Sequence, residues 1–278
     1  MDSGIYSVKQ YYDSNVQAEW ERLERHPFEF RFTTYMMDRY IQPGDSILDI
    51  GGGPGRYSLH YAQKGCEVTL VDLSDQNAGF AQEKAKELGV PLRAHAENCL
   101  ALDRLELGQF DHVFLMGPLY HLLRRDERET AVRLALERLK PGGVFYASFI
   151  LDFAGFIYDL KNGPGLLRQD LENPATARLL ESIVSGTEYN GPAFTSACFI
   201  NPKSIRPFLE PFGLTELHLF GQEGILAPNE TQVLSYPKEE QELWIETAKK
   251  FLELPEFLAF SEHAMYIGRK PALLNSDV

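Results

Sequence analysis

An apolar segment that runs into a cluster of glycines near residue 50 constrains the fold of this chain more than any other feature. Residues 46–50 read SILDI and residues 51–55 read GGGPG. A strand that ends in a glycine turn lets the backbone approach a ligand, and the next helix offers it unpaired N–H groups. Asp72 closes the following apolar segment, where an acidic residue can accept hydrogen bonds from two ribose hydroxyls. The pattern predicts a nucleoside-like ligand.

The residues around the glycines distinguish between nucleoside cofactors. The dinucleotide fingerprint GxGxxG needs a third glycine to pack the helix on the strand, and Arg56 or Ser58 occupies that position, depending on the frame. Asp49 precedes the glycines, and a carboxylate there repels a pyrophosphate but suits an ammonium or a sulfonium group. These residues favour S-adenosylmethionine over NAD. A glycine turn that joins a strand to a helix without any ligand is the other interpretation.

Two segments resemble known motifs. LDIGGGPGRYS at 48–58 resembles motif I of the class I S-adenosylmethionine-dependent methyltransferases, and LVDLS at 70–74 resembles their motif II. LKPGG at 139–143 is similar to the turn before their fifth strand. The resemblance is strong over 46–150 and weaker in the C-terminal strands. It implies an enzyme that transfers a methyl group from S-adenosylmethionine to a small molecule and leaves S-adenosylhomocysteine.

Alternating strand and helix patterns predict an α/β fold with a Rossmann-like, doubly wound sheet. Strands are expected at 46–50, 66–71, 90–95, 110–115, 143–150, 214–220 and 264–268. Helices are expected at 55–64, from a cap at Ser74 to Gly89, from Asp126 to the turn at 141–143, and at 202–212. The resemblance implies that the sheet has seven strands, mostly parallel, with the last one antiparallel.

Other segments extend this core. Residues 1–45 predict an N-terminal helical cap, with one helix near 14–25 and another from Pro27. We assign the methyltransferase core to 46–150 and 201–270, and helical substrate-lid insertions within it to 151–200 and 222–262. Ligands in such sheets lie outside the carboxyl ends of the strands, so the insertion after the fifth strand overhangs the site. It either selects the substrate or only excludes water, and the sequence leaves both open.

The resemblance also places a cofactor site. The residues that it assigns to cofactor binding are Asp49, Gly51, Gly52, Gly53, Gly55, Arg56, Asp72, Leu73, His95, Ala96, Glu97, Met116 and Gly117, with Tyr12 and Arg22 from the N-terminal segment. His95 stands where the family usually has an acidic residue, so adenine contacts are expected from the backbone of Ala96 and Glu97 or from Asn98. Tyr12 and Arg22 are expected to meet the methionine carboxylate, with Arg56 as a competing partner.

The segment 118–121 after the fourth strand is expected to form the floor between cofactor and substrate. His121 and Tyr120 are the candidate catalytic residues, and His121 is the candidate general base because an imidazole takes up a proton near neutral pH. A histidine at a helix start, bonded to a backbone carbonyl, is the alternative. Methyl transfer depends mainly on alignment and water exclusion, and it needs a base only when the nucleophile must lose a proton.

Composition limits the partners. The chain has 27 basic and 40 acidic residues, a net charge of −13, which disfavours a nucleic-acid substrate without excluding it. NPPY, DPPY and Pro-Cys motifs are absent, which favours methylation of an oxygen, nitrogen or carbon atom of a small molecule. Three scattered cysteines and no apolar run of ~18 residues predict a cytoplasmic chain with no membrane span and no metal site. The alternatives are a tRNA-modifying methyltransferase, a catalytically silent nucleoside-binding scaffold and, less favoured, an NAD-dependent oxidoreductase.

Overall fold

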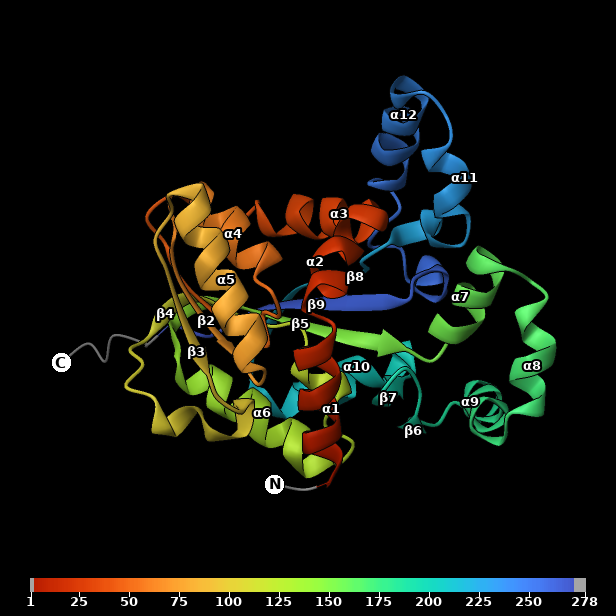
Figure 1. Cartoon of the computed structure of the whole chain (residues 1–278), viewed down its shortest axis with the longest axis horizontal. Helices are drawn as coiled ribbons and strands as arrows, with labels where there is room; N and C mark the ends of the chain where they lie inside the picture. The colour runs from red at the N-terminus through yellow and green to blue at the C-terminus, as the bar shows by residue number, and fades with distance from the viewer. Residues whose placement is uncertain (1–2, 273–278) are drawn as a thin grey trace.

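The computed structural model describes residues 3–272, and it places a twisted sheet between two layers of helices (Figure 1). The strands of the described chain are β1 (Ser46–Ile50), β2 (Glu67–Asp72), β3 (Leu92–Ala96), β4 (Phe110–Leu115), β5 (Leu139–Leu151), β6 (Tyr189–Pro192), β7 (Ser196–Ile200), β8 (Thr215–Gly221) and β9 (His263–Arg269). Strands β3, β2, β1, β4 and β5 lie side by side in that order and are parallel.

The last strand of the chain runs antiparallel to its neighbours. β9 pairs with β5 from Val144↔Arg269 to Ile150↔His263, and β8 pairs with its other edge. The start of β9 therefore lies at the carboxyl end of β5. The α/β sheet with an antiparallel last strand confirms the predicted fold class.

The predicted count of seven strands is wrong, because β6 and β7 form an additional hairpin inside the segment 151–200. β7 joins the main sheet only through the last two residues of β5, Ile150 and Leu151. β6 has four residues, YNGP, and neither glycine nor proline favours a strand. Local sequence therefore gave no strand signal, and pairing with β7 decides the structure.

Helices cover both faces of the sheet. Those that alternate with the strands are α4 (Arg56–Gln63), α5 (Asp75–Leu88), α6 (Arg125–Glu137) and α10 (Pro202–Leu209), with short 3-10 turns η1 (Cys99–Arg104), η2 (Pro118–Tyr120) and η3 (Glu210–Phe212). Successive residues of β4 contribute to opposite cores: Val113 packs with α6 and α10, and Phe114 packs with α4. The central strands are therefore buried on both faces, which explains their continuous apolar runs.

Three helices precede the sheet: α1 (Ser3–Ser14), α2 (Val16–Arg25) and α3 (Pro27–Met37). Helices α2 and α3 correspond to the predicted helices near 14–25 and from Pro27, whereas α1 was not predicted. Residues 1 and 2 of the expected cap lie outside the described chain. Phe28 and Phe32 of α3 are fully buried against the sheet. α1 packs against α5 and β7, so it bridges two parts of the sheet near its carboxyl edge.

Two further groups of helices extend from that edge (Figure 1). The segment after β5 forms α7 (Ala154–Asn162), α8 (Leu166–Glu172) and α9 (Pro174–Ser185). The segment after β8 forms η4 (Gly224–Asn229), α11 (Glu230–Leu234), α12 (Lys238–Ala248) and η5 (Pro255–Phe260). None of the helices within 3–272 has the length and apolar character needed to cross a membrane.

Candidate active site

The glycine loop after β1 forms the base of a cavity, which we call the inner cavity. Gly51 has φ +72°, and a Cβ at this position would lie 2.4 Å from the ring of Pro118. A Cβ on Gly52 would lie 2.7 Å from Oδ2 of Asp49. Real Cβ atoms do not approach other atoms so closely, so only glycine allows the ends of β1 and β4 to come together here. Both glycines line the inner cavity.

Asp49 lies beneath this loop and is 2% exposed. Its Oδ2 accepts a hydrogen bond of 2.7 Å from the hydroxyl of Ser58, at the start of α4. Burial raises the pKa of Asp49 to about 7, an effect that the Ser58 bond opposes and the charge of Asp72 reinforces. Asp49 is therefore a carboxyl group that changes charge near neutral pH and would be stabilised as an anion by a cationic ligand group.

Asp72, at the end of β2, organises the other side of the loop. Its Oδ2 accepts the N–H of Gly53 at 2.8 Å, and its Oδ1 accepts the N–H of Ser74 at 2.9 Å and the amide of Asn77 at 3.2 Å. Burial raises its pKa despite these bonds. The carboxylate lines the inner cavity and holds the glycine loop against β2 at the same time.

The loop after β3 closes the cavity on the next side. Glu97, Asn98 and Cys99 line it, whereas His95 and Ala96 do not. Glu97 accepts the N–H of Asn98 at 2.8 Å, and Asn98 caps η1 through the N–H of Leu100. Contacts to a ligand base are thus available from 97–99.

His121 is buried and hydrogen-bonded through both ring nitrogens. Nδ1 lies 3.3 Å from the carbonyl of Ser196 and 3.2 Å from the hydroxyl of Thr195, and Nε2 lies 2.7 Å from the hydroxyl of Tyr12. Because a carbonyl only accepts hydrogen bonds, Nδ1 carries the proton of the neutral ring and Nε2 accepts from Tyr12. Burial lowers the pKa of His121 to about 4. A histidine with these partners remains neutral at physiological pH and is a weak base, so the contacts correspond to the structural alternative.

Two of the three predicted partners for a ligand carboxylate, Arg22 and Arg56, already contact acidic groups. Arg22 donates to Glu29 at 2.5 and 3.3 Å and lies 3.4 Å from Glu19. Arg56 donates to the carbonyl of Trp20, stacks 3.9 Å above its ring and pairs with Glu24. Both arginines line the inner cavity. Arg22 also joins α2 to α3, and Arg56 joins α4 to α2.

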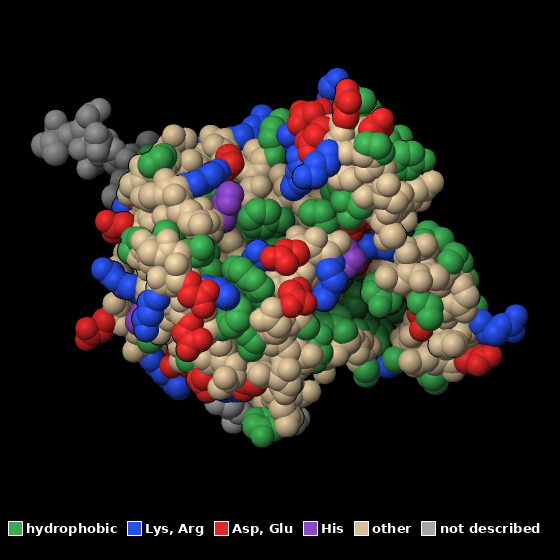
Figure 2. Space-filling model, turned by 45° about the horizontal axis from the view of Figure 1, so that its top comes forward, with side chains coloured by type: hydrophobic (Ala, Val, Ile, Leu, Met, Phe, Trp, Pro, Cys, Tyr) green, Lys and Arg blue, Asp and Glu red, His purple; other side chains and the backbone are tan. Residues whose placement is uncertain are grey.

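A second, larger cavity lies beneath the α7–α9 insertion, and we call it the outer cavity. Its volume is about 740 Å³, within the range of about 300–1,000 Å³ typical of small-molecule sites. Its lining combines charged side chains with a group of aromatic ones: Tyr11, Tyr12, Tyr120, Tyr158, Tyr189, Phe194 and Phe199. Figure 2 shows hydrophobic side chains inside a hollow on this side of the molecule, with charged side chains near its rim.

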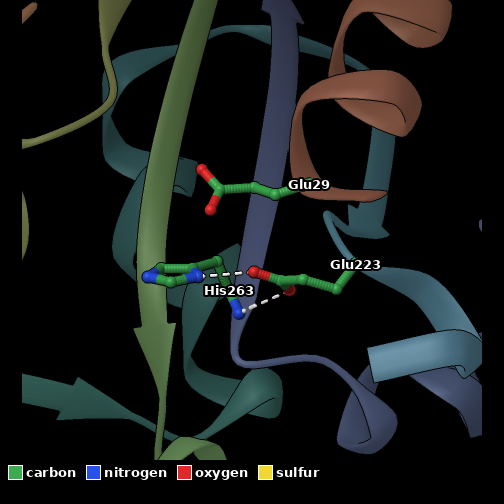
Figure 3. Close-up of side chains that lie close together, drawn as sticks. All are labelled: Glu29, Glu223 and His263. Atoms are coloured by element: carbon green, nitrogen blue, oxygen red, sulfur yellow. Dashed lines mark hydrogen bonds and ion pairs between the residues drawn. The ribbon is translucent and has the colours of Figure 1, made fainter. Parts of the chain in front are cut away.

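The two cavities share a wall made of six residues: Tyr12, Glu19, Arg22, Glu29, Tyr120 and His263. Glu223, which lines the outer cavity, contacts His263 twice: Nδ1 of the ring lies 2.6 Å from Oε1 of Glu223, and the backbone N–H of His263 donates to Oε2 at 3.0 Å. Glu29 extends from α3 toward the same histidine (Figure 3). These residues come from positions 29, 223 and 263, and no sequence motif links them.

Comparison with known proteins identifies the sheet. Residues 47–143 match a family model described as a methyltransferase domain. This segment is a methyltransferase domain. The ubiquinone biosynthesis O-methyltransferase of Azoarcus sp. (strain BH72) is 30% identical over 125 residues, which are 45% of this chain and 52% of that protein. The chain thus spans about half the length of the curated relatives that it matches.

Solved structures share the fold of the methyltransferase domain and its extensions. Magnesium protoporphyrin IX methyltransferase (ChlM) from Synechocystis PCC 6803, crystallised with bound SAH, has a TM-score of 0.57 at 16% identity, covering 96% of this chain and 100% of that one. The 1,6-didemethyltoxoflavin-N1-methyltransferase of Burkholderia thailandensis has a TM-score of 0.59 at 16% identity, covering 96% and 88%. At these identities the likeness concerns the fold, and the recognition of the family from its motifs is confirmed.

Most residues predicted for the site lie around the inner cavity of the methyltransferase domain. The predicted residues that line it are Asp49, Gly51, Gly52, Gly53, Arg56, Asp72, Leu73, Glu97, Met116, Gly117, Tyr12, Arg22, Tyr120 and His121. Gly55 does not line it; a Cβ there would lie 2.9 Å from Ala81, so this glycine serves the packing of the loop on α5. The sequence gave no signal for Glu29, Glu223 and His263.

Proposed function

We propose that the protein is an S-adenosylmethionine-dependent methyltransferase that binds the methyl donor in the inner cavity and a ring-containing small molecule in the outer cavity. The observation that carries this proposal is the shared wall: a cavity built by the motif I and motif II residues adjoins a cavity large enough for a small molecule. Such adjacency is what a direct transfer between two bound molecules requires.

The residues present fit the proposed cofactor. The glycine loop provides a cradle that a Cβ would fill, and Asp72 has a buried carboxylate for the ribose hydroxyls. Asp49 is a buried acid with a pKa of about 7, and a neighbouring ammonium group would stabilise its ionised form. Bound there, the cofactor would supply an electrophilic methyl group on a sulfonium.

The chain's own residues would bind, align and exclude water. Tyr12 is hydrogen-bonded to His121, which directly follows η2, and this bond connects α1 to the methyltransferase domain. The side chain of Tyr12 is part of the wall shared by the two cavities. The aromatic wall of the outer cavity supports stacking with a flat ring and excludes water from the transfer. The two cited methyltransferase structures are named for ring-bearing substrates, in agreement with a wall of this kind.

Charge supports a small molecule over RNA. The outer cavity is lined by Glu19, Glu29, Asp170, Glu223 and Glu262 against Arg22, Arg25 and Lys161, with His26 and His263, so its carboxyl groups outnumber its lysine and arginine side chains. A phosphate backbone would need the opposite balance. A cytoplasmic location remains a prediction from the sequence.

Calorimetry with S-adenosylhomocysteine and NADH in parallel tests the cofactor. We expect S-adenosylhomocysteine to bind and NADH not to bind. Asp72→Ala removes charge-assisted hydrogen bonds of about 1.5–3 kcal/mol and should weaken S-adenosylhomocysteine binding at least about tenfold. Asp75→Ala is the matched control, since Asp75 is exposed and pairs with Lys9 outside the cavity. Micromolar binding of NADH alone would refute the proposal.

Transfer of a labelled methyl group to a library of ring-containing alcohols, phenols and amines then tests for activity. A chain that binds S-adenosylhomocysteine tightly but methylates nothing, in the library or in a metabolite extract, would instead be a catalytically silent nucleoside-binding scaffold.

A further inference from the structure

His263 is positioned between the two cavities. It is the first residue of β9, paired with Ile150 at the carboxyl end of β5, and it lines both the inner and the outer cavity. Its ring centroid lies 6.2 Å from that of Tyr120, on the predicted floor between cofactor and substrate. A group at this position can meet an acceptor molecule at the point where a methyl group would be transferred.

Glu223 fixes the orientation of the imidazole. Nδ1 lies 2.6 Å from Oε1 of Glu223, and the same carboxylate also holds the backbone N–H of His263 at 3.0 Å. Because a carboxylate only accepts hydrogen bonds, Nδ1 carries the proton in the neutral ring, which leaves the lone pair on Nε2. Figure 3 shows that this other nitrogen points away from Glu223. A histidine held by a buried acid in this way is the arrangement of a general base and the group that orients it.

Charged groups from several elements surround His263. Burial lowers its pKa, the carboxylates of Glu223 and Glu29 raise it, Arg22 lowers it, and the net result is a pKa above the ordinary value. Glu262 precedes it in the chain and pairs with Lys161 of α7, while Tyr120 of η2 faces its ring. Among the described residues, Glu223 is the one carboxylate that is hydrogen-bonded to the ring.

A metal ion is the competing interpretation, since donor atoms of Glu29, Glu223 and His263 lie within 4.8 Å of one another. The carboxylate of Glu29, however, already accepts hydrogen bonds from the guanidinium of Arg22 at 2.5 and 3.3 Å. Oε1 of Glu223 already accepts a hydrogen bond from Nδ1–H of His263. A cation would have to displace Arg22 and the histidine proton. The ion pairs therefore favour proton transfer over metal binding.

His121 is less suited to the same role. Tyr12 donates to its Nε2, the carbonyl of Ser196 lies next to Nδ1, and its pKa is about 4. No such donor occupies Nε2 of His263 among the bonds of the described chain.

Resting on the proposed function, we infer that His263 is the catalytic proton acceptor, that Glu223 is its positioning residue, and that the methyl acceptor is a hydroxyl group on the molecule in the outer cavity. The hydroxyl oxygen forms a bond to the methyl carbon with a lone pair. The carbon–sulfur bond breaks, and its electron pair remains on sulfur. The hydroxyl proton passes to Nε2 of His263 and leaves the imidazolium paired with Glu223. A neutral amine would depend less on this base, because its lone pair is more nucleophilic than that of a neutral hydroxyl group.

The test uses the full chain with histidine labelled with ¹⁵N, and the variants His263→Gln and Glu223→Gln. His218→Gln is the matched control, because His218 forms a similar pair with Glu253 away from both cavities. Nuclear magnetic resonance should show the neutral His263 ring protonated on Nδ1. In Glu223→Gln, the carboxamide donates to Nδ1, so the proton should move to Nε2. A wild-type ring protonated on Nε2 when neutral would overturn the inference.

Kinetics with the hydroxyl-bearing acceptors of the library provide the second readout. His263→Gln should lower kcat at least about 100-fold while S-adenosylhomocysteine still binds, and the control should be unchanged. In the wild type, kcat/KM should rise with pH through the pKa of His263, and this rise should disappear in His263→Gln. A kcat within about threefold of wild type would refute the role of His263, and loss of activity with a chelator would identify a metal site instead. Failure of the wild type to bind S-adenosylhomocysteine would refute the proposed function rather than this inference.

Discussion

Acidification should weaken binding of S-adenosylhomocysteine because it neutralises Asp49. This carboxyl group is 2% exposed beneath the glycine loop, accepts one hydrogen bond from Ser58, and has a pKa of about 7. The ammonium group of the ligand is stabilised by the ionised form alone. Affinity should therefore depend on the ionised fraction of Asp49.

The size of the effect follows from that pKa. Between about pH 6 and about pH 5 the ionised fraction falls about tenfold, so the dissociation constant should rise about tenfold, or about 1.4 kcal/mol. The ligand-free fold responds in the opposite direction, because the raised pKa means that the folded state binds this proton more tightly than the unfolded state does. The resulting stabilisation is present below about pH 4 and is lost as pH rises to about 7, a difference of at most about 4 kcal/mol.

Isothermal titration calorimetry between pH 5 and 7, in buffers of different ionisation enthalpy, measures both affinity and proton release. Asp49→Asn should flatten the pH dependence attributable to this residue. Asp111→Asn is the control, because Asp111 has a pKa of about 2 and stays ionised throughout. The pKa of Asp72 is also raised, so the test is the difference between wild type and Asp49→Asn. Identical pH profiles for these two proteins would refute the role of Asp49.

Two further substitutions test the packing around the site. Gly52→Ala would place a Cβ 2.7 Å from Oδ2 of Asp49, and it should lower the free energy of unfolding by about 1–3 kcal/mol and weaken S-adenosylhomocysteine binding. Gly79→Ala is the control: a Cβ there has nothing within 4 Å, so it should be neutral or stabilising. Thermal unfolding and calorimetry measure both effects. Lys161→Met leaves Glu230, which is 1% exposed, with His26 as its one ionic partner among the described residues, and it should cost about 3–5 kcal/mol in denaturant unfolding. A loss below about 0.5 kcal/mol would contradict the buried ion pair.

Several elements of the fold were predictable because their signals are local. Strand β1 ends at the glycine loop, Ser74 caps α5 through the N–H of Asn77, and Gly89 ends that helix with φ +68°. In each case a few neighbouring residues determine the backbone conformation. Strand β6 was missed because YNGP gives no local strand signal. Helix α1 was missed, and its contacts with α5 and β7 come from segments distant in sequence.

The amino-acid sequence by itself determined the class of fold, the glycine cradle and the positions of Asp49 and Asp72, because a strand, a turn and a helix that follow one another place these residues. The tertiary structure decided the chemistry beside the cradle. His121 became a neutral, bonded histidine through contacts with Tyr12 and Ser196. His263 met Glu223 because β9 runs antiparallel and returns its first residue to the carboxyl end of β5. The pKa of each histidine depends on burial and on charges from distant segments, which only the folded chain brings together.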